Sequence, residues 1–273
     1  MVQAMVIWST IKSIGSPRTF ELAQVNRSVW TTQLRQLNVF EDPPFVAPHG
    51  KSAEAQWAHF VELEERKRVG MACFILEAEF TTLYHLQPSV LLSDLKTTLP
   101  AAEELWAAPT AEAWHAIHVT TPAPLMVEAV VGHVMADSLF PLSAAVVLGP
   151  LSTQIIIQGL HLLLYSSRQF RLLGMGVVAG MAVAGIRRSL GRLARGPNPF
   201  EPELGGRVED VGTGKMESAV RVAYHFAQMA TYLAPEELDV VAGRRSTVAG
   251  EAAAGKVHRS RLTLIQSRKL TLP

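Results

Sequence analysis

The sequence predicts an all-α fold, a multi-helix bundle, and three observations support this prediction. Apolar residues recur at helical spacing through most of the chain, strand-like alternation is almost absent, and proline or glycine clusters separate the periodic segments. With 273 residues, 48% of them hydrophobic, the chain is long enough to bury a substantial core. Its formal net charge of +1 attracts neither nucleic acid nor acidic lipid globally, so such binding would need a local patch.

The first predicted helix covers residues 16–37. Ser16 and Pro17 are typical of an N-cap and a first helical position, and Pro43 with Pro44 marks the loop that follows. Residues at helical spacing form its expected buried stripe: Phe20, Ala23, Val25, Trp30, Leu34 and Leu37.

The second predicted helix is longer and covers residues 52–84. Its second half, residues 69–83, is apolar on nearly every side and should be buried among other helices. Its first half is highly charged. Two pairs there have the acid four positions before the arginine, which supports a helix: Glu62 with Arg66, and Glu64 with Arg68.

Shorter helices follow, divided by prolines. We expect them at residues 101–106, 111–118, 127–139 and 216–233, with residues 205–214 as a loop before the last one.

Two uncharged runs, residues 138–167 and 172–186, have two interpretations. A membrane-spanning helix needs about 20 predominantly apolar residues, and the first run is long enough. Prolines, glutamines and His161 interrupt it, however, which is typical of the core of a large helical domain. The core interpretation is therefore preferred, and an integral membrane protein is the alternative.

Two glycine patterns resemble nucleotide-binding loops but lack the required context. Residues 174–180 have no strand before them, so we interpret these small residues as permitting close helix packing. Residues 212–215 end in a lysine as a phosphate loop does, but Met216 replaces the hydroxyl residue and Glu209 stands at the first glycine position.

The chain shows no pattern that indicates catalysis or metal binding. Cys73 is the only cysteine, which excludes an internal disulfide and a zinc site of several thiolates, and its apolar surroundings predict a protonated thiol. His115 and His118 share a helix face but lack further ligands nearby, and Glu77 and Glu79 diverge on a helix. Neither a nucleophile elbow nor a zinc-protease motif occurs. We therefore expect no enzyme and no cofactor in this chain.

Several spaced motifs between residues 17 and 114 resemble the fungal-specific transcription factor domain, also called the middle homology region. The first helix carries FELAQ and LRQL at residues 20–24 and 34–37. The central run of that family is similar to Trp57 followed by EERKR at 64–68 and FILE at 74–77, and its ending is similar to LP at 99–100, EELW at 103–106 and AEAW at 111–114. Met71 and Glu77 depart mildly from the family pattern, which more often has an aromatic residue and an aspartate there.

The resemblance implies a nuclear, all-helical regulatory module that controls transcription, with residues 1–235 as a partial regulatory domain. In this family a zinc-bearing DNA-binding segment normally lies upstream, so we expect an N-terminally incomplete protein, zinc only in an absent finger, and DNA binding only through that finger. Expected partners are transcription-machinery proteins or a second copy of the chain, without a membrane. A metabolic or secondary-metabolite gene cluster is the expected target.

The motif residues are the candidate site, as packing anchors or surface contacts: Trp57, Glu64, Arg66, Arg68, Phe74, Glu77, Pro100, Leu105, Trp106 and Trp114. The aromatic members should be ordinary core anchors, since buried rings contribute most area per residue. The charged cluster at 64–68 has two interpretations: a solvated face with weak ion pairs, which we prefer, and a buried network that orients neighbouring helices.

Residues 236–273 form a basic tail that we expect to be flexible, because few large apolar residues accompany its charges. The tail would be simply solvated, a nuclear-import signal, or a source of phosphate contacts with DNA. Its cationic residues are Arg244, Arg245, Lys256, Arg259, Arg261, Arg268 and Lys269.

Overall fold

The computed structural model of the chain describes residues 7, 17–43, 52–136, 148–194, 211–234 and 237–238. In this part of the chain all regular structure is helical apart from two isolated β-bridges, so the predicted all-α fold class is confirmed.

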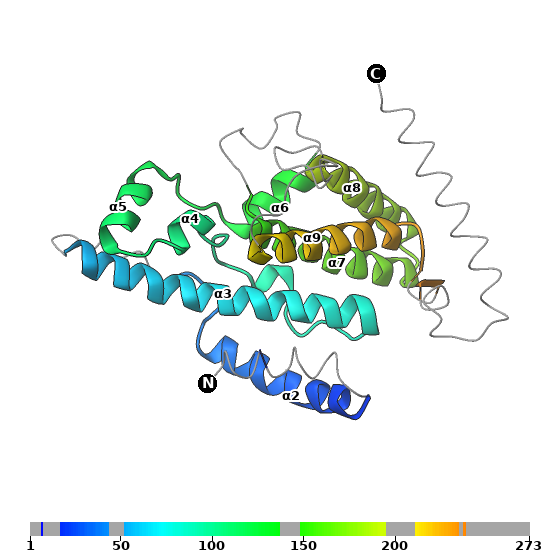
Figure 1. Cartoon of the computed structure of the whole chain (residues 1–273). Coiled ribbons are helices and arrows are strands. Elements are labelled where there is room, and N and C mark those ends of the chain that lie inside the picture. The colour runs from blue at the N-terminus through cyan, green and yellow to red at the C-terminus, as the bar shows by residue number, and fades with distance from the viewer. Residues whose placement is uncertain are drawn as a thin grey trace, which may run out of the picture.

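The first two long helices begin and end where the sequence predicts. Helix α2 spans Pro17–Gln36 and α3 spans Ala53–Tyr84. The Ser52 side chain caps α3 by accepting a hydrogen bond from the Ala55 amide, and α3 ends at His85, whose φ of 57° is left-handed. Helix α3 runs through the middle of the molecule, with α2 along one side and the later helices along the other (Figure 1).

Two short helices lie over the N-terminal half of α3 (Figure 1): α4 (Glu103–Trp106) and α5 (Ala111–Thr120). Thr110 caps α5 by accepting from the Ala113 amide at 3.2 Å. A small apolar cluster between α5 and α3 fixes this end, because Leu105 and Trp114 are buried there against the partly buried Trp57.

The C-terminal half of α3 packs against a second group of helices: α6 (Val127–Met135), α7 (Pro150–Leu172), α8 (Gly176–Ala194) and α9 (Val211–Ala230). Helix α7 is central, since it contacts α3, α8 and α9. Every residue from Ser152 to Leu162 is buried, including the consecutive Ile155, Ile156 and Ile157. The part of the first uncharged run that is described is therefore core, as the preferred interpretation states; residues 138–147 lie outside the described residues.

Among the described helices, none combines the length and the apolar character that crossing a membrane requires. The second uncharged run covers the last residue of α7, the α7–α8 turn and the first part of α8. Only the inward face of α8 is buried there, at Ala179, Gly185 and Ile186, whereas Leu172, Val177 and Met181 are exposed, so the core interpretation is only partly right for this run.

The buried stripe predicted for α2 is only partly right. Ala23, Trp30 and Leu34 are fully buried, but Val25 and Leu37 are 71% and 55% exposed. The side chain of Phe20 lies outside the described residues. The inward face instead includes Arg27 and Thr31, which an apolar pattern does not identify.

The structure shows where the two glycine patterns lie. Close helix packing at residues 174–180 is wrong, because a Cβ added at Gly176 or Gly180 would meet no atom within 4 Å. Gly174 instead turns the chain after α7 with a φ of 79°. The pattern at 212–215 lies in the first turn of α9, which begins at Val211. The helix therefore begins within the loop predicted for residues 205–214. An isolated glycine costs a helix about 1 kcal/mol and does not end it.

Candidate functional site

A buried ion pair joins α2 to α3. Arg27 donates from Nε and Nη2 to the two carboxylate oxygens of Glu77, at 2.6 and 2.5 Å. Glu77 is fully buried and Arg27 is 8% exposed. Such a bidentate pair fixes both the distance and the rotation between the helices.

The same pair holds the chain that follows α3. Arg27 also donates to the Gln87 carbonyl at 2.7 Å, and Glu77 accepts from the Ser89 amide at 2.8 Å. The Arg27 guanidinium lies 5.5 Å from the Phe80 ring centroid. Arg27, Glu77, Gln87 and Ser89, which we call the Arg27 clamp, therefore tie three segments together. Sequence analysis singled out Glu77 but missed Arg27, whose partner is fifty positions away.

A second polar cluster attaches α4 to the charged half of α3. Glu64 is 3% exposed, accepts from Arg68 Nε at 2.9 Å, and accepts from the Ala101 amide at 2.9 Å. Arg68 also pairs with Glu103 at 3.1 Å, and its guanidinium lies 4.7 Å from the Trp106 ring centroid. We call these five residues the Glu64 network.

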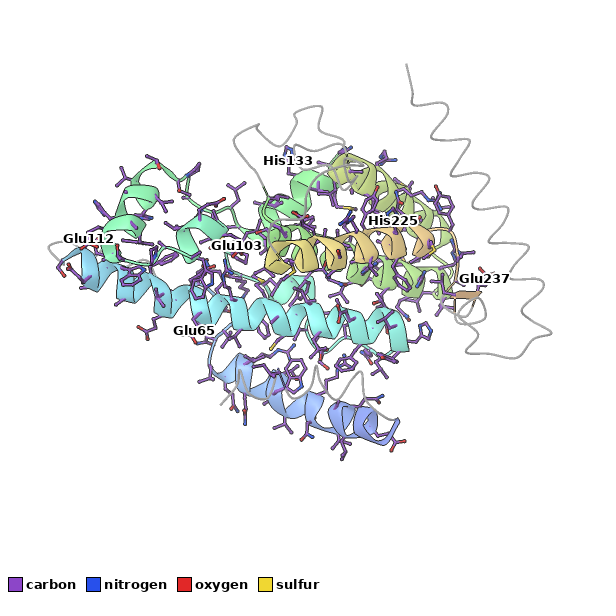
Figure 2. The ribbon with its side chains drawn as sticks, viewed as in Figure 1. Glu65, Glu103, Glu112, His133, His225 and Glu237 are labelled. Carbon is purple, nitrogen blue, oxygen red and sulfur yellow. The ribbon has the colours of Figure 1, made fainter. Side chains whose placement is uncertain are left out.

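The Glu64 network corrects the preferred interpretation of residues 64–68 as a solvated face. Its central carboxylate is buried because α4 and the segment before it cover this part of α3; Figure 2 shows Glu103 on α4 above α3 and Glu65 on α3 itself. The alternative interpretation, a network that orients neighbouring segments, fits Glu64 and Arg68.

Arg66 and Lys67 bind the chain on two other sides of α3. Arg66 donates to the carbonyls of Leu37 and Asn38 at the end of α2, not to Glu62 as its spacing suggests. Lys67 lies 3.4 Å from Asp42 and donates to the Thr98 hydroxyl. Burial raises the pKa of Asp42, but hydrogen bonds from Thr97 and Thr98 together with Lys67 outweigh it, and the net pKa is lowered.

The remaining candidate residues have different surroundings. Phe74 is fully buried in the main core, Pro100 is buried in the segment before α4, and Leu105 is buried on α4 itself. Trp114 is 3% exposed, lies 5.4 Å from Phe60 between ring centroids, and stacks on His118 at 4.6 Å. Trp57 and Trp106 are only partly buried. The cationic residues of the tail lie outside the described residues.

Two groups that could perform chemistry, Cys73 and Glu79, lie in the apolar second half of α3. Burial, and then the Glu77 carboxylate, raise the pKa of the Cys73 thiol, so it remains protonated as predicted. Burial also raises the pKa of Glu79. No group of three or more His, Cys, Asp or Glu side chains in the described residues could hold a metal ion, and His118 is stacked on Trp114. The arrangement is suited to positioning helices.

A comparison with curated proteins finds one similar segment. Over 122 residues, 42% of this chain, the sequence is 28% identical to a nicotinate catabolism cluster-specific transcription factor of Emericella nidulans. The aligned segment represents 14% of that protein, so the chain spans about a seventh of the relative's length. No family model matches the chain, and no solved structure matches it. Part of this all-helical chain is thus similar to a fungal transcription factor.

Proposed function

We propose that this chain is a regulatory region of a fungal-type transcription factor. The observation that carries the proposal is the similarity to the transcription factor of Emericella nidulans over 122 residues. The contacts of α3 support it, because the residues that resemble the family motifs, Glu64, Arg68 and Glu77, form buried networks that hold other segments in place. A module that acts by contact needs such fixed geometry.

The finer parts of the proposal follow from the same resemblance. The chain works in the nucleus, contacts transcription-machinery proteins or a second copy of itself, and reaches DNA through a zinc finger supplied outside these 273 residues. Its target is a metabolic or secondary-metabolite gene cluster, in line with the name of the relative. For the basic tail, a solvated segment is the preferred interpretation, ahead of an import signal and of phosphate contacts.

A reporter assay tests the regulatory role. The full chain is fused to a heterologous DNA-binding domain in a fungal host, and transcription from the matching promoter is measured. We expect the fusion to change reporter output relative to the DNA-binding domain alone. Glu77→Leu, which breaks the Arg27 clamp, should abolish the change, whereas Glu62→Ala at an exposed position of α3 should preserve it. A nuclear fusion at equal abundance that leaves the reporter unchanged contradicts the proposal.

A gel-shift assay tests the assignment of DNA binding to a separate finger. The 273-residue chain alone should show only weak, salt-sensitive association that does not discriminate between sequences, because the cationic residues of the tail would contact phosphates and not bases. Tight association with a particular DNA sequence would overturn this part.

A further inference from the structure

A cavity of about 700 Å³ lies between the C-terminal end of α3, the second half of α7, α8 and the end of α9. Its size is within the usual range of small-molecule sites, about 300–1,000 Å³. Much of the wall is apolar and includes Val183 of α8 and Phe226 of α9. Helices α7, α8 and α9, which supply most of the lining, lie on the opposite side of α3 from α2 (Figure 1).

The charged residues on the cavity wall are all cationic among those that the structure describes. Arg168 and Arg171 come from α7 and Arg187 from α8, while neither aspartate nor glutamate lines the cavity. An apolar chamber bordered by arginines favours an organic anion over a neutral or cationic molecule, because low-dielectric walls strengthen the attraction.

Two of these arginines are held rigidly at the C-terminal end of α9. Arg168 donates to the Ala230 and Leu233 carbonyls at 2.7 and 3.1 Å. Arg187 donates to the Thr231 carbonyl at 2.6 Å, and its guanidinium lies 3.8 Å from the Tyr232 ring centroid. Their charges are therefore already in position, which lowers the entropy cost of binding an anion.

His161 provides the second polar feature of the wall. It is 3% exposed, and its Nδ1 lies 2.9 Å from Gln158 Oε1, so Nδ1 donates and Nε2 is left as an acceptor. Nε2 is buried and has no hydrogen-bond partner among the described residues. Burial, and then Arg168, lower the pKa of His161 to about 3, so the ring is neutral at physiological pH. A buried acceptor of this kind calls for a donor.

We propose that this cavity binds a small organic anion that has an apolar body and a hydrogen-bond donor, with the negative charge near Arg168, Arg171 and Arg187 and the donor on His161 Nε2. The binding itself stands apart from the proposed transcriptional role. A signalling role for the ligand, in which its binding alters the activity of the regulatory region, rests on the proposed function.

The probe for a first test is 8-anilinonaphthalene-1-sulfonate, which combines an aromatic body, an N–H donor and a negative charge. Fluorescence titration of the full chain should give saturable binding of one probe per chain. The neutral analogue N-phenyl-1-naphthylamine, which lacks the sulfonate, should bind about tenfold more weakly or worse. Absence of saturable binding, or equal affinity for the two probes, overturns the proposal.

A matched pair of glycine variants locates the site. Gly180 lines the cavity and Gly176, one turn earlier on α8, does not; an added Cβ meets no atom within 4 Å at either position. Gly180→Leu should weaken binding of the sulfonate probe about tenfold by filling the cavity, whereas Gly176→Leu should change it less than about twofold. Equal binding by both variants and the unaltered chain would place the probe outside the cavity, on exposed apolar residues such as Leu173 and Val177, and overturn the cavity assignment.

The role of His161 has its own readout. His161→Phe keeps a planar ring but removes the acceptor, so the sulfonate probe should bind about five- to tenfold more weakly while circular dichroism remains unchanged. Unchanged affinity in this variant would contradict the hydrogen bond from the ligand to His161.

The two proposals can fail separately. If the full chain binds the sulfonate probe but its fusion does not change reporter output, the transcriptional role alone is refuted.

Discussion

Arg27 of α2 and Glu77 of α3 form a bidentate ion pair with a closest nitrogen–oxygen distance of 2.5 Å, and the carboxylate is fully buried. Both charges have lost their water, and each is compensated mainly by the other and by backbone groups of the chain after α3. Removal of one partner alone should therefore have the largest effect on the free energy of unfolding.

Breaking the pair from one side should be costly. Arg27→Met or Glu77→Leu alone should lower the free energy of unfolding by about 3–5 kcal/mol, because each leaves an uncompensated buried charge. The double variant should recover most of this loss, since it buries no charge. Urea denaturation of the full chain measures all three. A double variant no more stable than the worse single variant would contradict this account.

The Glu64 network should show a clear coupling energy. In a double-mutant cycle with Glu64→Ala and Arg68→Ala, we expect about 1–3 kcal/mol, because the shared carboxylate is buried and also accepts from the Ala101 amide. The same cycle on Glu62 and Arg66 is the control. It should give a coupling near zero, since Arg66 binds backbone carbonyls of the segment after α2. Equal coupling in the two cycles would restore the solvated-face interpretation of this cluster.

Gly70 should not tolerate a side chain. A Cβ there would lie 2.9 Å from Val39 Cγ1 and 3.1 Å from the Val39 carbonyl oxygen, so Gly70→Ala should destabilise the protein by about 1–3 kcal/mol through overpacking. Gly180→Ala introduces the same methyl group into open space within α8 and should stabilise by about 0.5–1 kcal/mol. Thermal unfolding measures the stability of the two variants. If both are destabilised, the replacement of a helix glycine, and not the contact with Val39, accounts for the loss.

His161 should make stability fall in acid. Its folded-state pKa of about 3 lies below the ordinary histidine pKa of 6.5, so the unfolded chain binds more protons between these two values and the stability of the fold decreases as the pH falls through that window. Between pH 7 and pH 5 the contribution is about 2 kcal/mol. The loss of stability over this interval should be smaller by that amount in His161→Phe, as measured by urea denaturation. Identical pH dependence in the two proteins would show that His161 is not buried as a neutral ring.

The helix positions follow from local chemistry, and the polar contacts do not. The apolar second half of α3 and the charge pairs of its first half are sufficient to predict that helix, because periodicity and side-chain pairing act over a few residues. The burial of Arg27 could not be predicted, because an apolar pattern assigns arginine to the exposed face of a helix. Its burial depends on Glu77, fifty positions away, and periodicity carries no information about that pairing.

No pattern in the sequence predicts the cavity. His161 is one of several polar interruptions in the first uncharged run, and no sequence pattern relates it to Arg187. Only the packing of α7, α8 and α9 against α3 brings these two residues to one wall. Conversely, the glycines at 174–180 suggested close packing from composition alone, and their real neighbours are few.

The last turns of α3 separate the Arg27 clamp from the cavity. Thr81 is buried on the cavity wall, and its hydroxyl donates to the Glu77 carbonyl oxygen at 3.0 Å. Widening the chamber by shifting this turn would draw the Glu77 carboxylate away from Arg27. No residue of α2 lines the chamber, yet its ion pair with Glu77 would oppose such a shift of the wall.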